Sequence, residues 1–391
     1  MSWNVPENKL SVRQRAVMDM LWKNTATRHW IQGCAGSGKT LVLLHAMERL
    51  ATQRPTESIC FLTFTHALKD LVRTGLSQVV SGRVVVMTHT EFLAKKRKFD
   101  HVFLDEVQDI SKRDLEGVMA LAGNLQIAGD PDQRIYSNGT DESQVNLVLK
   151  PKSERLFDVY RLSSLLRKLA LSVLPSTHLV EGRDKGTGPT YQIKVLKFDD
   201  ENAEAAWMFT EARACAKGGY NASAILFSTH DQIKEFSEKV ARFLGKPIPP
   251  EKQKRLPRQT GPSPDYTAFN DFWRAQGVPL AYLGNGNGDF SQSETQPMVF
   301  LMTYHSSKGL DFESVFLPNV NKGLYLGQAD ARQVDPDAER RLMYVAITRS
   351  RTRLFVSYTR ELHPLLRNHP RELVVEFSPK LRSSGPAEGL F

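Results

Sequence analysis

The segment Gly33-Cys34-Ala35-Gly36-Ser37-Gly38-Lys39-Thr40 fits the pattern GxxxxGK[ST], whose residue types and spacing suit a phosphate group. It follows an apolar run and precedes a segment with helical periodicity, and this context favours a phosphate-binding loop. Backbone N–H groups of such a loop surround phosphates, and the amino end of the helix adds partial positive charge. Lys39 would reach the β and γ phosphates, and Thr40 would ligate Mg²⁺. A glycine-rich turn before a helix is the structural alternative.

Two adjacent carboxylates, Asp105 and Glu106, end the apolar run at 102–104. Nucleotide hydrolysis needs a carboxylate near Mg²⁺ and a group that orients the attacking water. Asp105 suits the first role and Glu106 the second. A solvated turn or the N-cap of a following helix would explain the same two residues, but the phosphate loop upstream favours the catalytic interpretation.

These residues need a scaffold, and the first 150 residues alternate short apolar runs with amphipathic segments, which predicts a parallel α/β sheet. The predicted strands are 29–32, 58–65, 83–88, 101–105 and 125–129, and the predicted helices are 39–50, 67–76 and 112–121. The carboxyl ends of parallel strands share one edge, where ligands bind. We therefore expect the phosphate loop and the two carboxylates to meet there.

A second α/β core is predicted over 151–382, with strands at 224–227, 298–302 and 353–358 and helices at 162–174 and 232–244. A segment rich in Pro, Gly and polar residues interrupts it at 246–297, and this composition predicts loops around a short helix at 266–276. The last residues, 383–391, are expected to form a frayed tail. The chain thus divides into a first domain over 1–150 and a second over 151–382.

The composition narrows the possible partners and compartments. The 391 residues include 52 Lys and Arg against 43 Asp and Glu, a formal net charge of +9, which favours a polyanionic partner. The basic runs at 95–98 and 252–258 are either solvated loops or phosphate contacts. Three cysteines without a Cys/His cluster predict neither disulfides nor a zinc site. No signal peptide or membrane span is recognisable, so we expect a cytoplasmic protein without a membrane partner.

With the phosphate loop and the paired carboxylates in place, the chain resembles the superfamily 1 helicases of the UvrD/Rep/PcrA-like group. Further segments are similar to that family's motifs in the family's order, namely 10–14, 61–67, 88–92, 128–136, 160–161, 303–312 and 339–349. Taken alone, 303–312 reads equally as a strand and turn, and 339–349 as a charged amphipathic helix. The resemblance implies two tandem RecA-like P-loop NTPase cores with parallel sheets, which use ATP and Mg²⁺.

The resemblance also implies roles for individual residues. The nucleotide would be bound by Gln14, which reads adenine, Gly33, Gly36, Ser37, Gly38, Lys39, Thr40, Gly309 and Asp311, which touches the ribose. The catalytic residues would be Lys39, Glu106, the γ-phosphate sensor Gln133, Arg161 and the arginine finger Arg349. Mg²⁺ would be held by Thr40 and Asp105. Single-stranded DNA would contact Phe64, Thr65, His66, Thr88, His89, Tyr136, Thr303 and His305.

The chain departs most from the family in three places, and Arg134, His66 and Asp311 are milder changes. Only residues 93–101 separate the second DNA segment from the strand that carries Asp105, so the first accessory domain is absent at this position. The second accessory domain can be no larger than the insert at 246–297. After Tyr136 the chain has Ser137-Asn138-Gly139 where the family often has an aromatic residue and an arginine that clamp a base.

These expectations lead to two functional hypotheses. The first is an ATP-dependent translocase or helicase that moves 3′ to 5′ on single-stranded DNA and hydrolyses ATP between two RecA-like cores. The second is an ATP- and DNA-gated adaptor that regulates a partner nuclease or other effector without processive unwinding. A P-loop kinase or GTPase would leave Arg161, Arg349 and the match at 303–312 unexplained.

Overall fold

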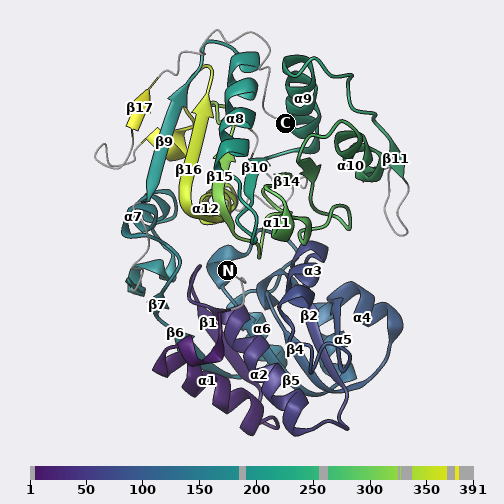
Figure 1. The fold of residues 1–391 in the computed structure, drawn as a ribbon. Helices are drawn as coiled ribbons and strands as arrows, with labels where there is room; N and C mark the ends of the chain where they lie inside the picture. The colour runs from purple at the N-terminus through teal and green to yellow at the C-terminus, as the bar shows by residue number, and fades with distance from the viewer. Residues whose placement is uncertain are drawn as a thin grey trace.

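The computed structural model describes residues 5–184, 191–254, 263–324, 326, 337–367 and 375–377. Two parallel sheets flanked by helices follow one another along the chain, the first below the second in Figure 1. The prediction of an α/β fold with two tandem RecA-like cores is confirmed. The expected tail at 383–391 and most of the basic run at 252–258 lie outside the described residues.

The first sheet has six strands, and each is parallel to its neighbours. In spatial order they are β3 (Val84–Thr88), β2 (Ile59–Thr63), β4 (Phe99–Leu104), β5 (Ala122–Gly129), β1 (His29–Gly33) and β6 (Lys152–Leu156). Five correspond to predicted strands. The sixth, β6, lies beyond the predicted boundary at residue 150 and pairs with β1. Its sequence Lys-Ser-Glu-Arg-Leu is mostly polar, as suits an edge strand, and it therefore gave no apolar signal.

Six α-helices accompany this sheet in the described part of the first core. They are α1 (Val12–Lys23), α2 (Lys39–Gln53), α3 (His66–Gly75), α4 (His89–Lys95), α5 (Lys112–Leu121) and α6 (Glu142–Leu149). The helices α2, α3 and α5 match the predicted segments. The segments that form α1, α4 and α6 were not predicted as helices. Each nevertheless begins at a capping box, in which two side chains accept hydrogen bonds from N–H groups that would otherwise be unpaired.

The second sheet has seven described strands, again parallel to their neighbours. In spatial order they are β13 (Leu280–Tyr282), β14 (Val299–Thr303), β10 (Ser223–Phe227), β15 (Phe312–Leu317), β16 (Ser350–Tyr358), β9 (Gln192–Lys197) and β17 (Val375–Phe377). The prediction for 246–297 was incomplete, because this segment supplies β13 to the sheet edge besides the expected helix. Two short pairs, β7 (Asp158–Val159) with β8 (Arg183–Asp184) and β11 (Gln253–Lys254) with β12 (Ser263–Pro264), lie outside the large sheets.

Helices flank the second sheet on both sides (Figure 1). The described ones are α7 (Ser164–Val173), α8 (Glu201–Cys215), α9 (His230–Phe243), α10 (Tyr266–Ala275), α11 (Gln292–Thr295), α12 (Ala338–Ile347) and α13 (Pro364–Arg367). The helix α10 is the short helix predicted in the insert. The segment before Arg349 forms α12, so the alternative of a charged amphipathic helix describes its secondary structure correctly.

The two cores are joined by continuous apolar packing. One buried cluster contains residues of both, including Leu68 of α3 and Leu310 before β15. A Cβ atom on Gly309 would lie 2.8 Å from the Leu68 side chain, so the cores touch closely there. All three cysteines, Cys34, Cys60 and Cys215, are buried, and burial raises the pKa of the Cys34 and Cys60 thiols to about 12. No described helix has the length and apolar character needed to cross a bilayer.

Candidate nucleotide site and nucleic-acid groove

The glycine-rich loop connects the end of β1 to the start of α2, as the motif predicts. Gly36 and Gly38 have φ values of +79° and +86°, a left-handed conformation that glycine adopts without strain. A Cβ atom on Gly36 would lie 3.0 Å from the Cβ of Arg161, so a larger residue would push that arginine off the loop. The Lys39 ammonium donates hydrogen bonds to the carbonyls of Gly33, at 2.7 Å, and Cys34, at 3.3 Å.

Thr40 and Asp105 meet directly beneath this loop. The Thr40 hydroxyl donates to the Asp105 carboxylate at 2.6 Å, which places two hard oxygen donors side by side. Burial, and next the negative charge of Glu106, raise the pKa of Asp105 to about 7. Burial alone would also raise the pKa of Glu106, but the ammonium groups of Lys308 and Lys39 outweigh it and lower that pKa. Glu106 is therefore the ionised partner of this carboxylate pair.

A lysine from the second core completes the acidic cluster. Lys308, whose side chain is 1% exposed, lies 2.6 Å from the Asp109 carboxylate and 3.9 Å from that of Glu106. It also donates to the backbone carbonyl of Gln133. Because Asp109, Glu106 and Gln133 all belong to the first core, this buried ammonium ties the two cores together beside the proposed catalytic base. No role for Lys308 was predicted, although it lies within the matched segment 303–312.

Two arginines of the predicted set lie at the same interface, and Arg349 bonds across it. Arg349 donates to the Gln133 side chain at 3.0 Å, and Gln133 in turn donates to Asp130 at 2.6 Å. Arg161 pairs with Asp311 and donates to the carbonyl of Thr348 at 3.0 Å. Asp311 thus faces two arginines, since Arg349 lies 3.9 Å from its other oxygen. The structure brings the predicted finger, sensor and ribose residues into one network.

A pocket between the cores exposes most of these groups together. The predicted residues that line it are Gly36, Gly38, Lys39, Thr40, Glu106, Gln133, Arg161, Gly309, Asp311 and Arg349. Asp105 lies beneath the lining, where Thr40 contacts it. Arg351 also lines the pocket and was missed, although its position two residues after Arg349 was a usable signal. The remaining lining residues are Ala35, Leu41, Leu68 and Leu71.

Three predicted nucleotide residues lie just outside this lining. Gln14 is buried at the start of α1 and donates to the carbonyl of Ser37 at 3.0 Å. Its amide would lie 2.5 Å from a Cβ atom on Gly38, so it packs directly on the loop. The Ser37 hydroxyl is buried and has no hydrogen-bond partner among the described residues. Gly33 is on the opposite side of the loop, where it lines a second pocket.

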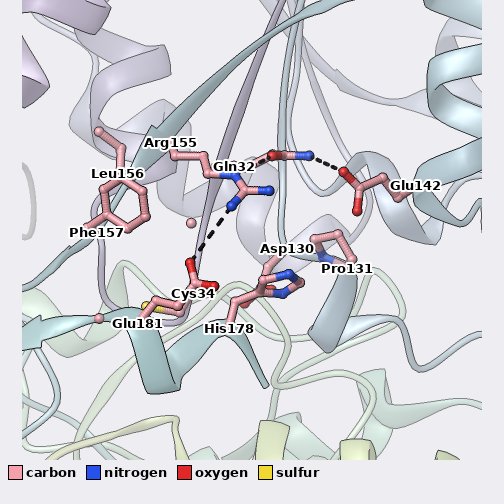
Figure 2. Close-up of a pocket in the computed structure, with 12 residues that line it drawn as sticks. Gln32, Cys34, Asp130, Pro131, Glu142, Arg155, Leu156, Phe157, His178 and Glu181 are labelled. Carbon is pink, nitrogen blue, oxygen red and sulfur yellow. Dashed lines mark hydrogen bonds and ion pairs between the residues drawn. The ribbon is translucent and has the colours of Figure 1, made fainter. Parts of the chain in front are cut away.

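That second pocket lies where β1, β5 and β6 end. Figure 2 shows Gln32 between Arg155, which donates to it at 3.4 Å, and Glu142, to which it donates at 3.1 Å. His178 lines the same pocket and lies 2.9 Å from Asp132. Burial would lower the pKa of His178, but the Asp132 carboxylate more than offsets it and the pKa is raised. Most polar side chains of this pocket are paired with one another, which suits a structural role beside the phosphate loop.

A groove between the cores collects most of the predicted DNA-binding residues. Its lining consists of Phe64, Thr65, His66, Ala67, Tyr136, Ser228, His230, Gly284, Asn285, Thr303, His305 and Ser306. The rings of Phe64 and Tyr136 have centroids 4.6 Å apart, and Tyr136 and His305 are 5.5 Å apart. Residues of both cores therefore form one aromatic row. Six lining residues were not among the predicted ones, namely Ala67, Ser228, His230, Gly284, Asn285 and Ser306. Local signals existed for four of them, since Ala67 and Ser306 lie in the matched segments 61–67 and 303–312, and Gly284 and Asn285 begin the run Gly-Asn-Gly-Asn-Gly at 284–288.

Thr88 and His89 are not part of this lining. The Thr88 hydroxyl caps α4 by accepting from the N–H of Glu91 at 3.3 Å. The His89 ring is buried and stacks on Phe64, with centroids 5.1 Å apart. The structure thus places both residues outside the lining, with His89 packed on Phe64 and Thr88 capping α4.

The groove differs in charge from the candidate nucleotide pocket, which is the pocket between the cores that Lys39, Arg161 and Arg349 line. No Lys or Arg occurs among the described residues that line it. Burial lowers the pKa of His66 and His230, and together with the Lys308 charge it lowers that of His305 to about 4. The three imidazoles are therefore neutral at pH 7, and the groove offers hydroxyl, amide, imidazole and backbone groups.

Comparison with protein families agrees with this arrangement. A model of the UvrD-like helicase C-terminal domain matches residues 276–361, which carry β13 to β16 and Arg349. A model of an AAA domain matches residues 14–139, which carry the phosphate loop and both carboxylates. The two matches fall on the second and first cores, respectively.

Three curated relatives illustrate the kinship, all over short segments. The ATP-dependent DNA helicase Rep of Buchnera aphidicola subsp. Schizaphis graminum is 47% identical over 60 residues, 15% of this chain and 9% of the relative. The ATP-dependent DNA helicase PcrA of Leuconostoc citreum is 39% identical over 87 residues, which are 21% of this chain and 12% of the relative. DNA helicase II of Haemophilus influenzae is 37% identical over 95 residues, which are 24% of this chain and 13% of the relative. The matches thus cover only 9% to 13% of these relatives. Both cores, the ordered motifs and these matches together support a superfamily 1 helicase of the UvrD/Rep/PcrA-like group.

Proposed function

We propose that this chain is a DNA-dependent ATPase that translocates along single-stranded DNA, 3′ to 5′, and hydrolyses ATP between its two cores. The observation that carries the proposal is the hydrogen bond from Arg349 of the second core to Gln133 of the first, at 3.0 Å inside the shared pocket. A guanidinium held there adjoins the γ-phosphate sensor, where phosphoryl transfer develops negative charge. The family's relatives are named as ATP-dependent DNA helicases.

The residues present fit Mg²⁺ and a nucleoside triphosphate. Thr40 and Asp105 supply adjacent hard oxygen donors, and the buried Ser37 hydroxyl is free to meet a phosphate oxygen. Mg²⁺ bound with the triphosphate would neutralise charge that builds up on the phosphate oxygens. Among the described residues no three His, Cys, Asp or Glu side chains form a metal cluster, so phosphates and water would provide the other ligands.

The chain's own groups divide the remaining work. Lys39 and the loop N–H groups bind the phosphates, and Arg161 and Arg349 bring charge from the second core. Glu106, ionised beside Lys308, accepts a hydrogen bond from Gln108 at 2.5 Å and orients the attacking water. Strand binding across the groove would favour the closed arrangement of the cores and thereby accelerate hydrolysis.

Steady-state ATPase assays with poly-dT, with duplex DNA and without nucleic acid test the proposal. We expect the rate to be highest with poly-dT. Arg349→Ala should lower kcat by at least about a hundredfold with little change in nucleotide affinity, because the arginine acts on charge that develops in the transition state. Equal rates under all three conditions would show that strand binding does not drive core closure.

One observation favours the adaptor hypothesis as a second candidate. The helix α4 ends at Lys95 and β4 begins at Phe99, so no accessory domain interrupts the first core at that point. An ATPase without such a domain has less surface with which to separate a duplex. In the adaptor hypothesis, its ATP-driven closure would instead signal to a nuclease or other effector. Strand-stimulated ATPase activity without movement along single-stranded DNA would favour this candidate over the translocase.

A further inference from the structure

The insert at 246–297 contains a tight hairpin, residues 284–287, at the groove. Gly284 and Asn287 exchange backbone hydrogen bonds of 3.0 Å and 2.8 Å, and the two residues between them form the turn. Asn285 and Gly286 have φ values of +49° and +75°. Two consecutive positive values are typical of a type I′ turn, for which Asn-Gly is the favoured pair. The hairpin bonds do not use the N–H groups of Asn285 and Gly286.

Helix α10 holds this hairpin in position. The buried Asn270 side chain donates to the carbonyl of Tyr282 at 3.0 Å and accepts from the Tyr282 N–H at 2.7 Å. The Tyr282 ring stacks on that of Tyr266, with centroids 3.5 Å apart. A turn anchored on both its backbone and its preceding ring is preorganised, so little conformational entropy would be lost when it binds a partner.

The turn spans the mouth of the groove from the second core to the first. Gly284 and Asn285 belong to the groove lining, and a Cβ atom on Gly284 would lie 2.8 Å from the Ser306 side chain. At the other side, a Cβ atom on Gly286 would lie 3.9 Å from the ring of His66, the first residue of α3. The turn therefore reaches the core opposite the one that carries it.

The character of the groove determines what the turn would contact. The aromatic row of Phe64, Tyr136 and His305 suits stacked bases. Phosphates need donors, and the described lining contains no Lys or Arg to supply them. Lys69, beside His66 at 3.3 Å, is already paired with Glu91 at 3.0 Å. The N–H groups of a turn with positive φ values and the amide of Asn285 are neutral donors that suit an anionic oxygen.

We propose that the Asn285–Gly286 turn contacts the phosphodiester backbone of a single strand in the groove and closes over it. This inference rests on the proposed function and adds a contact that the family motifs quoted above do not include. The turn then acts as a clasp: it is anchored on α10 of the same insert, spans the groove and faces His66 of the first core.

The variant Asn285→Asp tests the proposal with a minimal change. Asp tolerates the left-handed conformation nearly as well as Asn and has the same shape, but it brings a negative charge to the turn. We expect the Kd for fluorescent dT oligonucleotides to rise about tenfold at low salt, from repulsion by a phosphate a few ångströms away. Asn285→Gly, which keeps the turn without the charge, should change the Kd by less than about threefold.

Two controls separate the contact from other effects. Asn124→Asp adds the same charge near the amino end of β5, about 17 Å along the strand from its carboxyl end and outside the groove lining, and should leave the Kd unchanged. A dT oligonucleotide with uncharged methylphosphonate linkages should bind wild type and Asn285→Asp equally, because it removes the phosphate charge. Melting temperatures of all three variants establish that each is folded.

The outcomes are distinct. Tighter or unchanged binding of the natural strand by a folded Asn285→Asp variant would overturn the clasp while leaving the proposed function intact. A defect that persists with the methylphosphonate strand would assign the turn to bases or sugars and overturn the phosphate contact. Failure of the wild-type protein to bind any dT oligonucleotide would overturn the proposed function itself.

Discussion

The nucleotide pocket and the groove lie between the same two cores but are built from opposite chemistry. The pocket is lined by Lys39, Arg161, Arg349 and Arg351, with Glu106 and Asp311 between them. The groove is lined by hydroxyls, neutral imidazoles, aromatic rings and a backbone turn. A triphosphate must be held in one geometry for hydrolysis, which suits fixed charges. A strand that advances must be released at each step, which suits weak neutral contacts that exchange readily.

The largest effect should come from removing the loop ammonium. In Lys39→Ala the β and γ phosphates lose the only lysine of the loop, so we expect hydrolysis to fall to background and nucleotide affinity to drop. Glu106→Gln is the matched contrast, since it should retain nucleotide binding and lose turnover. Binding titrations beside hydrolysis rates distinguish the two. Near-normal turnover in Glu106→Gln would remove that residue from the role of base.

The buried pair of Lys308 and Asp109 should contribute strongly to stability. Lys308→Met leaves the Asp109 carboxylate buried without its partner, which costs about 3–5 kcal/mol in comparable pairs. The double variant Lys308→Met with Asp109→Asn removes both charges and should recover most of that loss. Urea unfolding of the two variants measures the difference. Equal stabilities would mean that the ion pair does not hold the cores together.

In the groove, the central ring should be the largest single contributor. Tyr136→Ala should weaken dT binding by about tenfold, because stacking on one aromatic side chain contributes about 1–3 kcal/mol per base. Tyr136→Phe keeps the ring and should retain most of the affinity. Fluorescence anisotropy with short oligonucleotides provides both values. Identical losses in the two variants would point to the hydroxyl instead of the ring.

A neutral groove should show a shallow dependence on salt. Each phosphate neutralised by a cation on a single strand steepens the slope of log K against log salt by about 0.7. The net charge of +9 would suggest many such contacts, but the described lining contains no Lys or Arg. We therefore expect a slope no steeper than about −1.4, the value for two phosphates. A slope several times steeper would mean that cations outside the lining dominate binding.

The pH dependence should be the smallest effect near neutrality. Because burial lowers the pKa of His66, His230 and His305, these groups are uncharged at pH 7, and strand affinity should not change between pH 7 and pH 8. A bound phosphate raises an imidazole pKa, so protonation favours the bound state and affinity should increase as the pH falls below 6. Loss of affinity between pH 7 and pH 8 would contradict a neutral groove.

The sequence predicted what is encoded locally. The phosphate loop, the pair Asp105 and Glu106, and helix α5 follow from short patterns whose geometry depends on neighbouring residues, and the resemblance located Arg349 opposite Gln133. The pairing of Lys308 with Asp109 could not be predicted, because the two residues are far apart in the sequence and meet only where the two cores pack together. Likewise, the composition of 246–297 predicted loops, but only the folded insert shows a turn at Asn285 and Gly286 opposite His66.

The three buried cysteines have a practical consequence for studying motion. Burial raises the pKa of all three thiols, to about 12 for Cys34 and Cys60, so they react slowly with alkylating dyes. Cysteines introduced at exposed positions on each core would therefore be labelled selectively, without first replacing Cys34, Cys60 or Cys215. Two such dyes would report the distance between the cores by single-molecule fluorescence, and so show whether that distance changes when ATP is added.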